Sequence, residues 1–514
     1  MLRKLSFSLF LVSLLVLSGC KISGTIAMDG NGIEGATVVL SGDATATTQT
    51  NDEGCYVFDS VKAGTYTVTM EPPAGYTRSI NQRVVKESDY VNIDDVNFSM
   101  GSASIRQTES GNVIGFREDN NSHAWLGIPY AKSDRWKAPK SADSWAGDTY
   151  MALEIGPLCT QFADLLAGVP EEEFGKATGC EDCLYLNIFA PEFAPEEIPA
   201  GDNRLPVMVW IHGGGNSIGQ GGTYNGQELA KEHNLIIVTF NYRLGPLGWF
   251  THPALQTGDL LDDSGNYGTI DIIRVLTWVR DNIENFGGDP DNVTVFGESA
   301  GAHDTLTMMI SPLATGLFHK GIVESGGIGT TEMSRGQNYM DDPVDPGHSY
   351  SSREAVNKLL IADGLAADRD EAKAYQDAMT NQQIQNYLLG KSNYDILDVY
   401  YGGYGGMISM PMVFRDGTIL PDADPLTLLE DTANYNEVPI MIGTNRDERK
   451  LFMILDPEFV VLLSGIPIRA KDKKYYELYS SYNTDAWKAT GVDEIASVLS
   501  ETDGQPGVYA YRFD

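Results

Sequence analysis

The segment around Ser299 restricts the fold of this chain more than any other feature of the sequence. An apolar run of strand length, 293–296, leads directly into Gly297-Glu298-Ser299-Ala300-Gly301, and a helical pattern follows over 305–310. A G-x-S-x-G sequence between a buried strand and a helix is typical of a sharp turn that presents a serine hydroxyl as a nucleophile. Glycines are needed because the turn strains the backbone and brings strand and helix close together. Ser299 is therefore the candidate nucleophile.

Two further apolar runs indicate a mostly parallel β-sheet. Residues 207–211 and 235–240 are nearly continuous apolar segments, as expected for strands that are buried on both faces. Between the second run and the strand before Ser299, apolar residues recur at helical spacing over 270–283. A strand, a crossover helix and a strand in this order predict an α/β domain with helices on both faces of the sheet.

The run 207–211 ends in His212-Gly213-Gly214-Gly215, where such a fold carries an oxyanion loop. Glycines let backbone N–H groups face the oxygen of a tetrahedral intermediate, and loss of one such donor raises the barrier by about 3 kcal/mol. The alternative is a plain glycine-rich turn without chemistry. Together with the turn at Ser299, this loop predicts acyl transfer through a serine.

Residues 105–514 resemble the type-B carboxylesterases, because several longer motifs occur in the order typical of that family. The resemblance implies an α/β-hydrolase fold, hydrolysis of small-molecule carboxylic esters, and no metal or organic cofactor. It makes the N–H groups of Gly214, Gly215 and Ala300 the oxyanion donors. The motifs are Gly127-Ile128-Pro129-Tyr130-Ala131, Glu181-Asp182-Cys183-Leu184-Tyr185-Leu186-Asn187, the oxyanion loop, Asn285-Phe286-Gly287-Gly288-Asp289-Pro290 and the turn at Ser299.

The same resemblance assigns the acid of a catalytic triad. The segment 439–448 ends in Asp447-Glu448 and matches the place where the family has its acid, so Glu448 is expected to orient and stabilise the imidazolium of a base. A solvated pair of acidic residues is the alternative for this segment. Asn216 stands where the family usually has an aromatic residue, so the shape of the acyl pocket stays open.

The cysteines are expected to include one disulfide. The resemblance pairs Cys159 with Cys183 and closes a loop of about 25 residues, which the chain-entropy model values at about 3 kcal/mol. Cys55 and Cys180 are then free. The alternative for Cys180-x-x-Cys183 is a metal site or a redox pair, but no second Cys/His pair lies at ligand spacing.

The catalytic base is absent from its expected place. In this fold the histidine follows the acid, yet no histidine occurs after Glu448. His303 is nearest to Ser299 in sequence, but its position on the following helix points it away from the pocket. His212 is expected to be structural, and the remaining five are ordinary surface or core residues: His123, His233, His252, His319 and His348.

Three explanations follow, in order of preference. The first is an active esterase whose hydrolase domain is C-terminally incomplete in this sequence. The second is a catalytically inactive, cholinesterase-like binding or adhesion protein. The third is an esterase with a displaced base. Ser299 and the oxyanion glycines favour the first.

Residues 20–100 differ from the rest of the chain. Short alternating runs, such as 36–40 and 65–69, lie between Gly, Asp and Asn turns and predict a small β-sandwich. The stretch 51–66 is similar to carboxypeptidase-regulatory and CnaB-like modules, which serve as spacers or contact glycans and proteins. It offers no nucleophile paired with a base, so we assign it no chemistry. A Ser/Gly/Ala linker over 99–104 is expected to follow.

Residues 1–19 have the pattern of a lipoprotein signal peptide. Arg3 and Lys4 precede an apolar run over 5–17, which is too short to cross a bilayer but suits a signal sequence. The run ends in Leu17-Ser18-Gly19-Cys20, which looks like a lipobox, and two or more acyl chains on Cys20 form a stable anchor. We expect a bacterial lipoprotein at the outer membrane. The alternative is a soluble protein that is cleaved elsewhere.

The charge argues against nucleic acid as a partner. Lys and Arg total 36 against 71 Asp and Glu, a formal charge of −35, and such a field repels phosphate backbones and anionic lipid surfaces. Contact with a membrane is therefore expected only through the lipid on Cys20. The loops 330–349 and 400–407 are expected to line the entrance to the site, but they do not identify the substrate.

Overall fold

The structure is a computed structural model that describes residues 21–514 except 89–90, 119–120, 165–166, 401–405, 455 and 464–465. The chain divides into two compact units, Met1–Ser102 and Ala103–Asp514. The expected signal peptide and Cys20 lie outside the described residues, so the lipid anchor stays a prediction. Within the described part, no helix combines the length and the hydrophobicity that a membrane span requires.

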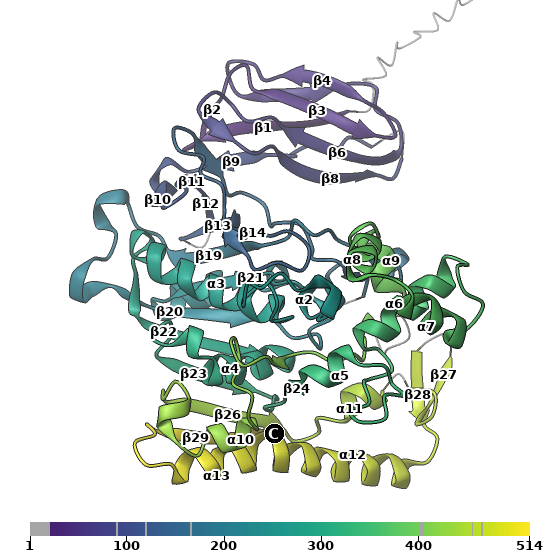
Figure 1. The fold of residues 1–514 in the computed structure, drawn as a ribbon. Helices are drawn as coiled ribbons and strands as arrows, with labels where there is room; N and C mark the ends of the chain where they lie inside the picture. Colours follow the sequence, from purple (N-terminus) through teal and green to yellow (C-terminus); the bar gives the residue numbers. More distant parts are fainter. Residues whose placement is uncertain are drawn as a thin grey trace, which may run out of the picture. The chain divides into compact units, whose positions relative to one another are not determined.

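The first unit is built from two small β-sheets (Figure 1). In both sheets buried and more exposed residues alternate, as in Gly64–Met70, where Tyr66, Val68 and Met70 point into the core. One sheet has the order β4-β3-β6-β8 and the other the order β2-β1-β5, with β9 parallel to β1. The strands are β1 (Ile22–Met28), β2 (Asn31–Gly32), β3 (Thr37–Gly42), β4 (Ala46–Gln49), β5 (Cys55–Phe58), β6 (Gly64–Met70), β8 (Ile80–Lys86) and β9 (Phe98–Met100).

The predicted linker over 99–104 is wrong in part. Strand β9 occupies its first residues, and a 3-10 helix follows over Ser102–Ser104. Phe98 and Met100 are buried while Ser99 is exposed, an alternation that allows β9 to pair with β1. The small side chains of this stretch thus belong to ordered structure.

The second unit contains a nine-stranded sheet with the order β12-β13-β19-β21-β20-β22-β23-β26-β29 (Figure 1). The first four strands pair in antiparallel fashion and all strands from β21 onward are parallel. The predicted mostly parallel sheet is therefore confirmed. The strands are β12 (Phe116–Glu118), β13 (Ser122–Pro129), β19 (Tyr185–Pro191), β20 (Leu205–Ile211), β21 (Ile236–Phe240), β22 (Gly288–Glu298), β23 (Lys320–Glu324), β26 (Ile440–Asn445) and β29 (Val508–Phe513).

Helices cover this sheet, and a separate group of helices packs beside it (Figure 1). Strand β21 is buried along its whole length, as its apolar sequence predicts. A second hydrophobic cluster joins α6, α8 and α9 to the segment after β21. The main helices are α1 (Gln227–His233), α3 (Tyr267–Asn282), α4 (Ala300–Ile310), α6 (Ser352–Ala362), α7 (Arg369–Asp377), α8 (Asn381–Leu389), α9 (Asn393–Asp398), α12 (Lys473–Lys488) and α13 (Glu494–Glu501).

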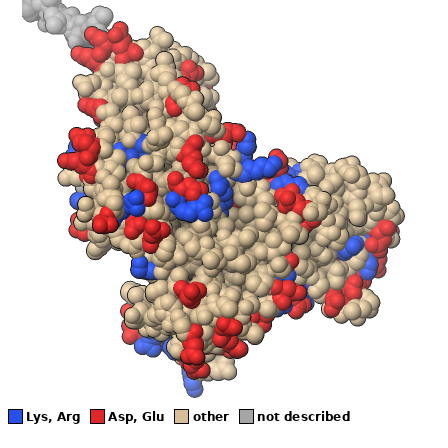
Figure 2. Space-filling view, turned by 60° about the vertical axis from the view of Figure 1, so that its left-hand side comes forward, with Lys and Arg blue, Asp and Glu red and all other residues tan. Residues whose placement is uncertain are grey.

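The acidic excess is spread over the surface. On the face that Figure 2 shows, Asp and Glu side chains are scattered among Lys and Arg side chains and do not form one acidic patch. Exposed ion pairs account for part of this mixture, such as Lys132 with Asp143 and Lys488 with Asp493. Pairs of this kind contribute little to stability because water screens them.

One ion pair is buried and connects α3 to the loop that follows β21. The guanidinium of Arg243 donates to the carboxylate of Asp271 at 2.8 and 2.7 Å, and the Arg243 N–H donates to the same carboxylate at 3.0 Å. The two side chains are only 5% and 0% exposed. A buried ion pair persists when further hydrogen bonds satisfy both groups, and Arg243 also donates to the carbonyl oxygens of Lys137 and Tyr267.

We predict that Asp271→Ala destabilises the second unit by about 3–5 kcal/mol, because it leaves the buried Arg243 charge uncompensated. Urea unfolding followed by tryptophan fluorescence measures this directly, since all seven tryptophans lie in this unit. The matched control is Asp143→Ala, which breaks the exposed pair with Lys132 and should change stability by less than about 1 kcal/mol. Equal effects of the two substitutions would contradict the prediction.

Candidate active site

Ser299 stands at the turn between β22 and α4 with a strained backbone. Its φ is 55° and its ψ is −115°, and it occupies the N-cap position of α4. Such a conformation costs a non-glycine residue about 1–3 kcal/mol and persists only where neighbouring structure holds it. The Ser299 N–H donates to the Glu324 carbonyl oxygen at 2.9 Å, and the Ser299 carbonyl oxygen accepts from the N–H groups of Ala302 and His303. The turn is thus fixed on both sides.

The glycines around Ser299 are required by close backbone contacts. A Cβ atom on Gly301 would lie 1.9 Å from the carbonyl oxygen of Ile211, and one on Gly297 would lie 2.5 Å from the carbonyl carbon of Gly301. A Cβ on Gly213 would lie 3.3 Å from the Cβ of Ser299. The structure therefore gives the predicted reason for these glycines, and it places the oxyanion loop directly against Ser299.

The oxyanion loop turns through three consecutive residues with positive φ. These are Gly214 at 106°, Gly215 at 61° and Asn216 at 54°. In the described part of the chain, no acceptor receives a hydrogen bond from the N–H of Gly214, Gly215 or Ala300. Ala300 is the first residue of α4, where a helix has unpaired N–H groups and a partial positive charge. These donors are available to a substrate oxygen.

Glu448 lies after β26, at the same end of the sheet as Ser299. Strands β22, β23 and β26 are neighbours and parallel, so their carboxyl ends meet at one edge. The Glu448 carboxylate accepts from Thr444 Oγ1 and from the Asn445 N–H, both at 2.6 Å, and is 9% exposed. These bonds fix its position, as expected of an orienting acid.

Two further carboxylates, which sequence reasoning did not identify, lie beside Glu448. Burial raises the pKa of Glu298 to about 7, and the charges of Glu448 and Glu324 raise it further in the same direction. Burial also raises the pKa of Glu324. All three carboxylates act on Tyr511, whose pKa rises to about 12 mainly through burial. The site therefore concentrates negative charge next to Ser299, and a cation placed there is stabilised.

None of the histidines in the described part of the chain donates to Glu448, whose partners there are Thr444 and Asn445. His212 is 1% exposed, bonds the Gly213 carbonyl oxygen through Nδ1 at 2.8 Å, and stacks on Tyr242. Burial lowers the pKa of His212 to about 4, so it is neutral at pH 7. Burial also lowers the pKa of His303 on α4.

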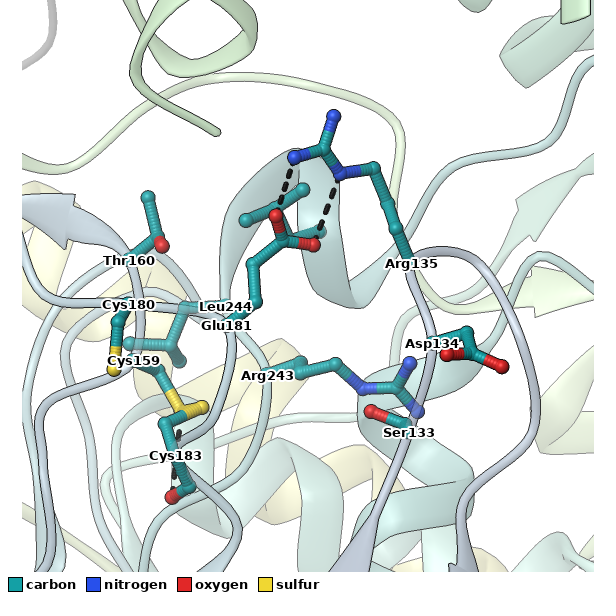
Figure 3. A pocket seen from close by; sticks show the side chains of 11 residues that line it. Ser133, Asp134, Arg135, Cys159, Thr160, Cys180, Glu181, Cys183, Arg243 and Leu244 are labelled. Atoms are coloured by element: carbon teal, nitrogen blue, oxygen red, sulfur yellow. Dashed lines mark hydrogen bonds and ion pairs between the residues drawn. A yellow bond between two sulfur atoms is a disulfide. The ribbon is translucent and has the colours of Figure 1, made fainter. Parts of the chain in front are cut away.

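The predicted disulfide between Cys159 and Cys183 is confirmed, and Cys55 and Cys180 are free. Figure 3 shows the bridge in a small pocket with Cys180 and an ion pair between Arg135 and Glu181. Arg135 Nε donates to Glu181 Oε2 at 2.9 Å. Because the bridge uses the Cys183 sulfur, Cys180-x-x-Cys183 does not provide two thiols for a metal or a redox pair.

The loops that were expected to line the entrance are only partly described. Residues 401–405 of the loop 400–407 lie outside the described residues. At the end of this loop, the Met407 sulfur would lie 3.1 Å from a Cβ on Gly215, so it contacts the oxyanion loop. The loop 330–349 contains β24 (Thr331–Glu332) and the short helix α5 (Met333–Gln337).

The raised pKa of Glu298 predicts a loss of stability as pH rises. Its folded pKa of about 7 exceeds the ordinary value of 4.5, so the folded state binds the proton more tightly than the unfolded state. This contribution is complete below pH 4.5 and lost as pH rises to about 7, by up to about 3 kcal/mol. Glu298→Gln should flatten that part of the curve of unfolding free energy against pH. The control Glu494→Gln, at an exposed position of α13, should not, and an unchanged slope in Glu298→Gln would contradict the prediction.

Comparison with protein-family models gives a match for each unit. Residues 102–506 match the carboxylesterase family, and residues 16–115 match the SdrD B-like domain. The N-terminal unit is thus similar to SdrD B-like domains, while its closer relationship to CnaB-like modules stays a prediction.

Individual relatives agree with the first match. The para-nitrobenzyl esterase of Bacillus subtilis is 36% identical over 360 residues, which cover 69% of this chain and 65% of the relative. The cocaine esterase of Homo sapiens is 33% identical over 68% of this chain and 56% of its own length. The chain therefore spans between about half and two thirds of the length of the curated relatives it matches.

Solved structures show the same similarity in three dimensions. A PNB esterase structure aligns with a TM-score of 0.56 at 30% identity and covers 80% of both chains. A carboxylesterase of Geobacillus stearothermophilus aligns with a TM-score of 0.58 at 26% identity and the same coverage. The fold of the second unit is thus the predicted α/β-hydrolase fold. Because the family match extends over most of the chain and includes the turn at Ser299, this chain belongs to the carboxylesterase family.

Proposed function

We propose that the unit Ala103–Asp514 hydrolyses carboxylic esters through an acyl intermediate on Ser299. One observation carries the proposal: the strained turn holds Ser299 against a loop whose N–H groups at Gly214 and Gly215 have no acceptor in the described part of the chain. The Ser299 oxygen attacks the ester carbonyl carbon, and the carbonyl oxygen takes up negative charge. The N–H groups of Gly214, Gly215 and Ala300 stabilise that charge.

The second half of the reaction follows from the same groups. When the tetrahedral intermediate collapses, the alcohol leaves with a proton and the acyl group stays on Ser299. A water molecule then attacks the acyl carbonyl carbon, passes through a second oxyanion and releases the carboxylic acid. The same N–H groups serve both oxyanions, so one loop lowers both barriers.

Glu448 is proposed to orient and stabilise the base as an imidazolium. Its carboxylate is fixed by Thr444 and Asn445, and Glu298 and Glu324 add negative charge nearby. This charge favours the protonated form of an imidazole. We assign no base among the seven histidines of the sequence, because His212 is engaged with Gly213 and no histidine of the described part bonds Glu448.

The proposed substrates are small, uncharged esters with short acyl chains. The three carboxylates beside Ser299 and the formal charge of −35 both repel anionic substrates. The names of the relatives describe esters that those proteins act on, and they support the reaction class only.

The first unit and the N-terminus are proposed to place the enzyme at a membrane. The sequence pattern 1–20 supports an exported lipoprotein that is anchored to the outer membrane through Cys20. The unit Met1–Ser102 would then act as a spacer or contact glycans or proteins, as do modules of similar sequence.

A binding or adhesion protein is the second candidate function, because no histidine in the described part of the chain bonds Glu448. A pure binding protein has no need for a reactive Ser299. Reaction of Ser299 with an ester therefore separates the two functions.

We predict that the 514-residue chain hydrolyses p-nitrophenyl acetate very slowly, because a positioned base contributes a factor of about 10²–10⁴. Added imidazole should replace part of that base next to Glu448. At about 0.1 M imidazole the protein-dependent rate should rise at least about tenfold. Steady-state release of p-nitrophenol measures it, after subtraction of the rate with imidazole alone.

Three variants test where the added imidazole acts. Ser299→Ala should abolish the imidazole-dependent rate, and Glu448→Gln should reduce it strongly. The matched control is Asp447→Asn, because Asp447 is the neighbouring acid and pairs with Arg446 and Lys450 instead. It should keep the full response. An equal response in Ser299→Ala would overturn the proposed hydrolase, and fast turnover without imidazole would show that one of the seven histidines acts as a base.

A further inference from the structure

The backbone of the oxyanion loop has to be held in place by other groups. Residues 214–216 all have positive φ, a region that glycine adopts freely and asparagine more easily than most other residues. Of these three residues only Asn216 has a side chain. Its contacts are therefore the means by which a side chain of this stretch can fix the loop.

Asn216 points into the protein and not toward an acyl pocket. It is 5% exposed, its Nδ2 donates to Asp304 Oδ1 at 3.3 Å, and its Oδ1 accepts from the Tyr242 hydroxyl at 3.1 Å. Its carbonyl oxygen accepts from the Gly245 N–H at 2.7 Å. The residue that replaces the usual aromatic side chain of the family thus has an internal role.

Asp304 connects this contact to the nucleophile. It lies on α4, the helix whose N-cap residue is Ser299. Its side chain is 0% exposed, and its Oδ2 has no hydrogen-bond partner in the described part of the chain. Burial raises the pKa of Asp304 to about 7, against the opposite effect of the bond from Asn216. The groups that face it are Asn216 and Tyr242, which is also buried.

Tyr242 contributes a second connection to the same loop. Its hydroxyl lies 2.8 Å from the His212 carbonyl oxygen and 3.1 Å from Asn216 Oδ1, so it contacts residues on both sides of the three glycines. Its ring stacks on His212 with a centroid distance of 4.4 Å. The loop is therefore bounded by Tyr242 at both ends and by Asp304 at Asn216.

We propose that Asn216 and Asp304 are positioning residues that hold the oxyanion loop at a fixed place relative to Ser299. The inference deepens the proposed function, since it gives these residues a role in presenting Gly214 and Gly215 to a substrate oxygen. Asp304 and Ser299 belong to one helix, so the bond from Asn216 joins the two halves of the site. A neutral carboxyl at Asp304 also avoids a negative charge behind the developing oxyanion.

Amide hydrogen exchange of the full 514-residue chain tests this inference without any substrate. Mass spectrometry of peptides that cover 213–219 measures how often the loop opens. Asp304→Ala and Asn216→Gly should each accelerate exchange there about tenfold, because each leaves a buried polar partner unsatisfied. Asn216→Gly is informative because glycine suits the positive φ, so only the side-chain bonds are lost. Asp304→Asn keeps an acceptor for Asn216 and should preserve wild-type exchange.

Two controls make the result specific. Thr307→Val removes another buried hydroxyl of α4, which bonds the His303 carbonyl oxygen and not the loop, and should leave exchange over 213–219 unchanged. Ser299→Ala should also leave it unchanged, so that failure of the hydrolase proposal is seen separately in the ester assay. The inference is overturned if Asp304→Ala and Asn216→Gly exchange like wild type, if Asp304→Asn behaves like Asp304→Ala, or if exchange rises equally in β22 and α4.

Discussion

The left-handed backbone of Ser299 is the constraint on which the rest of the site depends. A residue with this conformation can be accommodated only if strand and helix approach closely, and that approach is possible because Gly297 and Gly301 lack side chains that would strike β20. The same closeness brings Gly213 against Ser299. The turn therefore determines both where the hydroxyl stands and where the oxyanion loop begins.

The electrostatics of the site follow from burial. Glu298, Glu324 and Glu448 gather at the carboxyl ends of neighbouring strands, where water does not fully solvate them, and the pKa of Glu298 rises as a result. Such an arrangement disfavours anions and favours an imidazolium next to the serine. On the other side of the loop, Asp304 is buried with a raised pKa and adds little negative charge at moderately acidic pH. The N–H groups of the loop and of α4 then act on the substrate oxygen from a region of low charge.

Much of this architecture could be predicted from the sequence, because its determinants are local. Buried strands, the glycines around Ser299 and the glycine run after His212 each depend on a few consecutive residues. The disulfide between Cys159 and Cys183 followed from a resemblance over longer motifs and is present in the structure. The other features depend on contacts between distant segments. Glu298 and Glu324 meet Glu448 only through the strand order, and the inward turn of Asn216 depends on Asp304, which lies 88 residues later. The role of β9 was missed because its pairing with β1 joins opposite ends of the first unit.

The most direct test of the account is to locate a covalent adduct on the protein. The 514-residue chain is treated with an alkyl fluorophosphonate in the presence of imidazole, and the modified peptide is sequenced by tandem mass spectrometry. The account predicts one adduct per chain on Ser299, and a much lower yield in Glu448→Gln. An adduct on another residue, or an unmodified Ser299 under conditions that label an ordinary serine esterase, would contradict it.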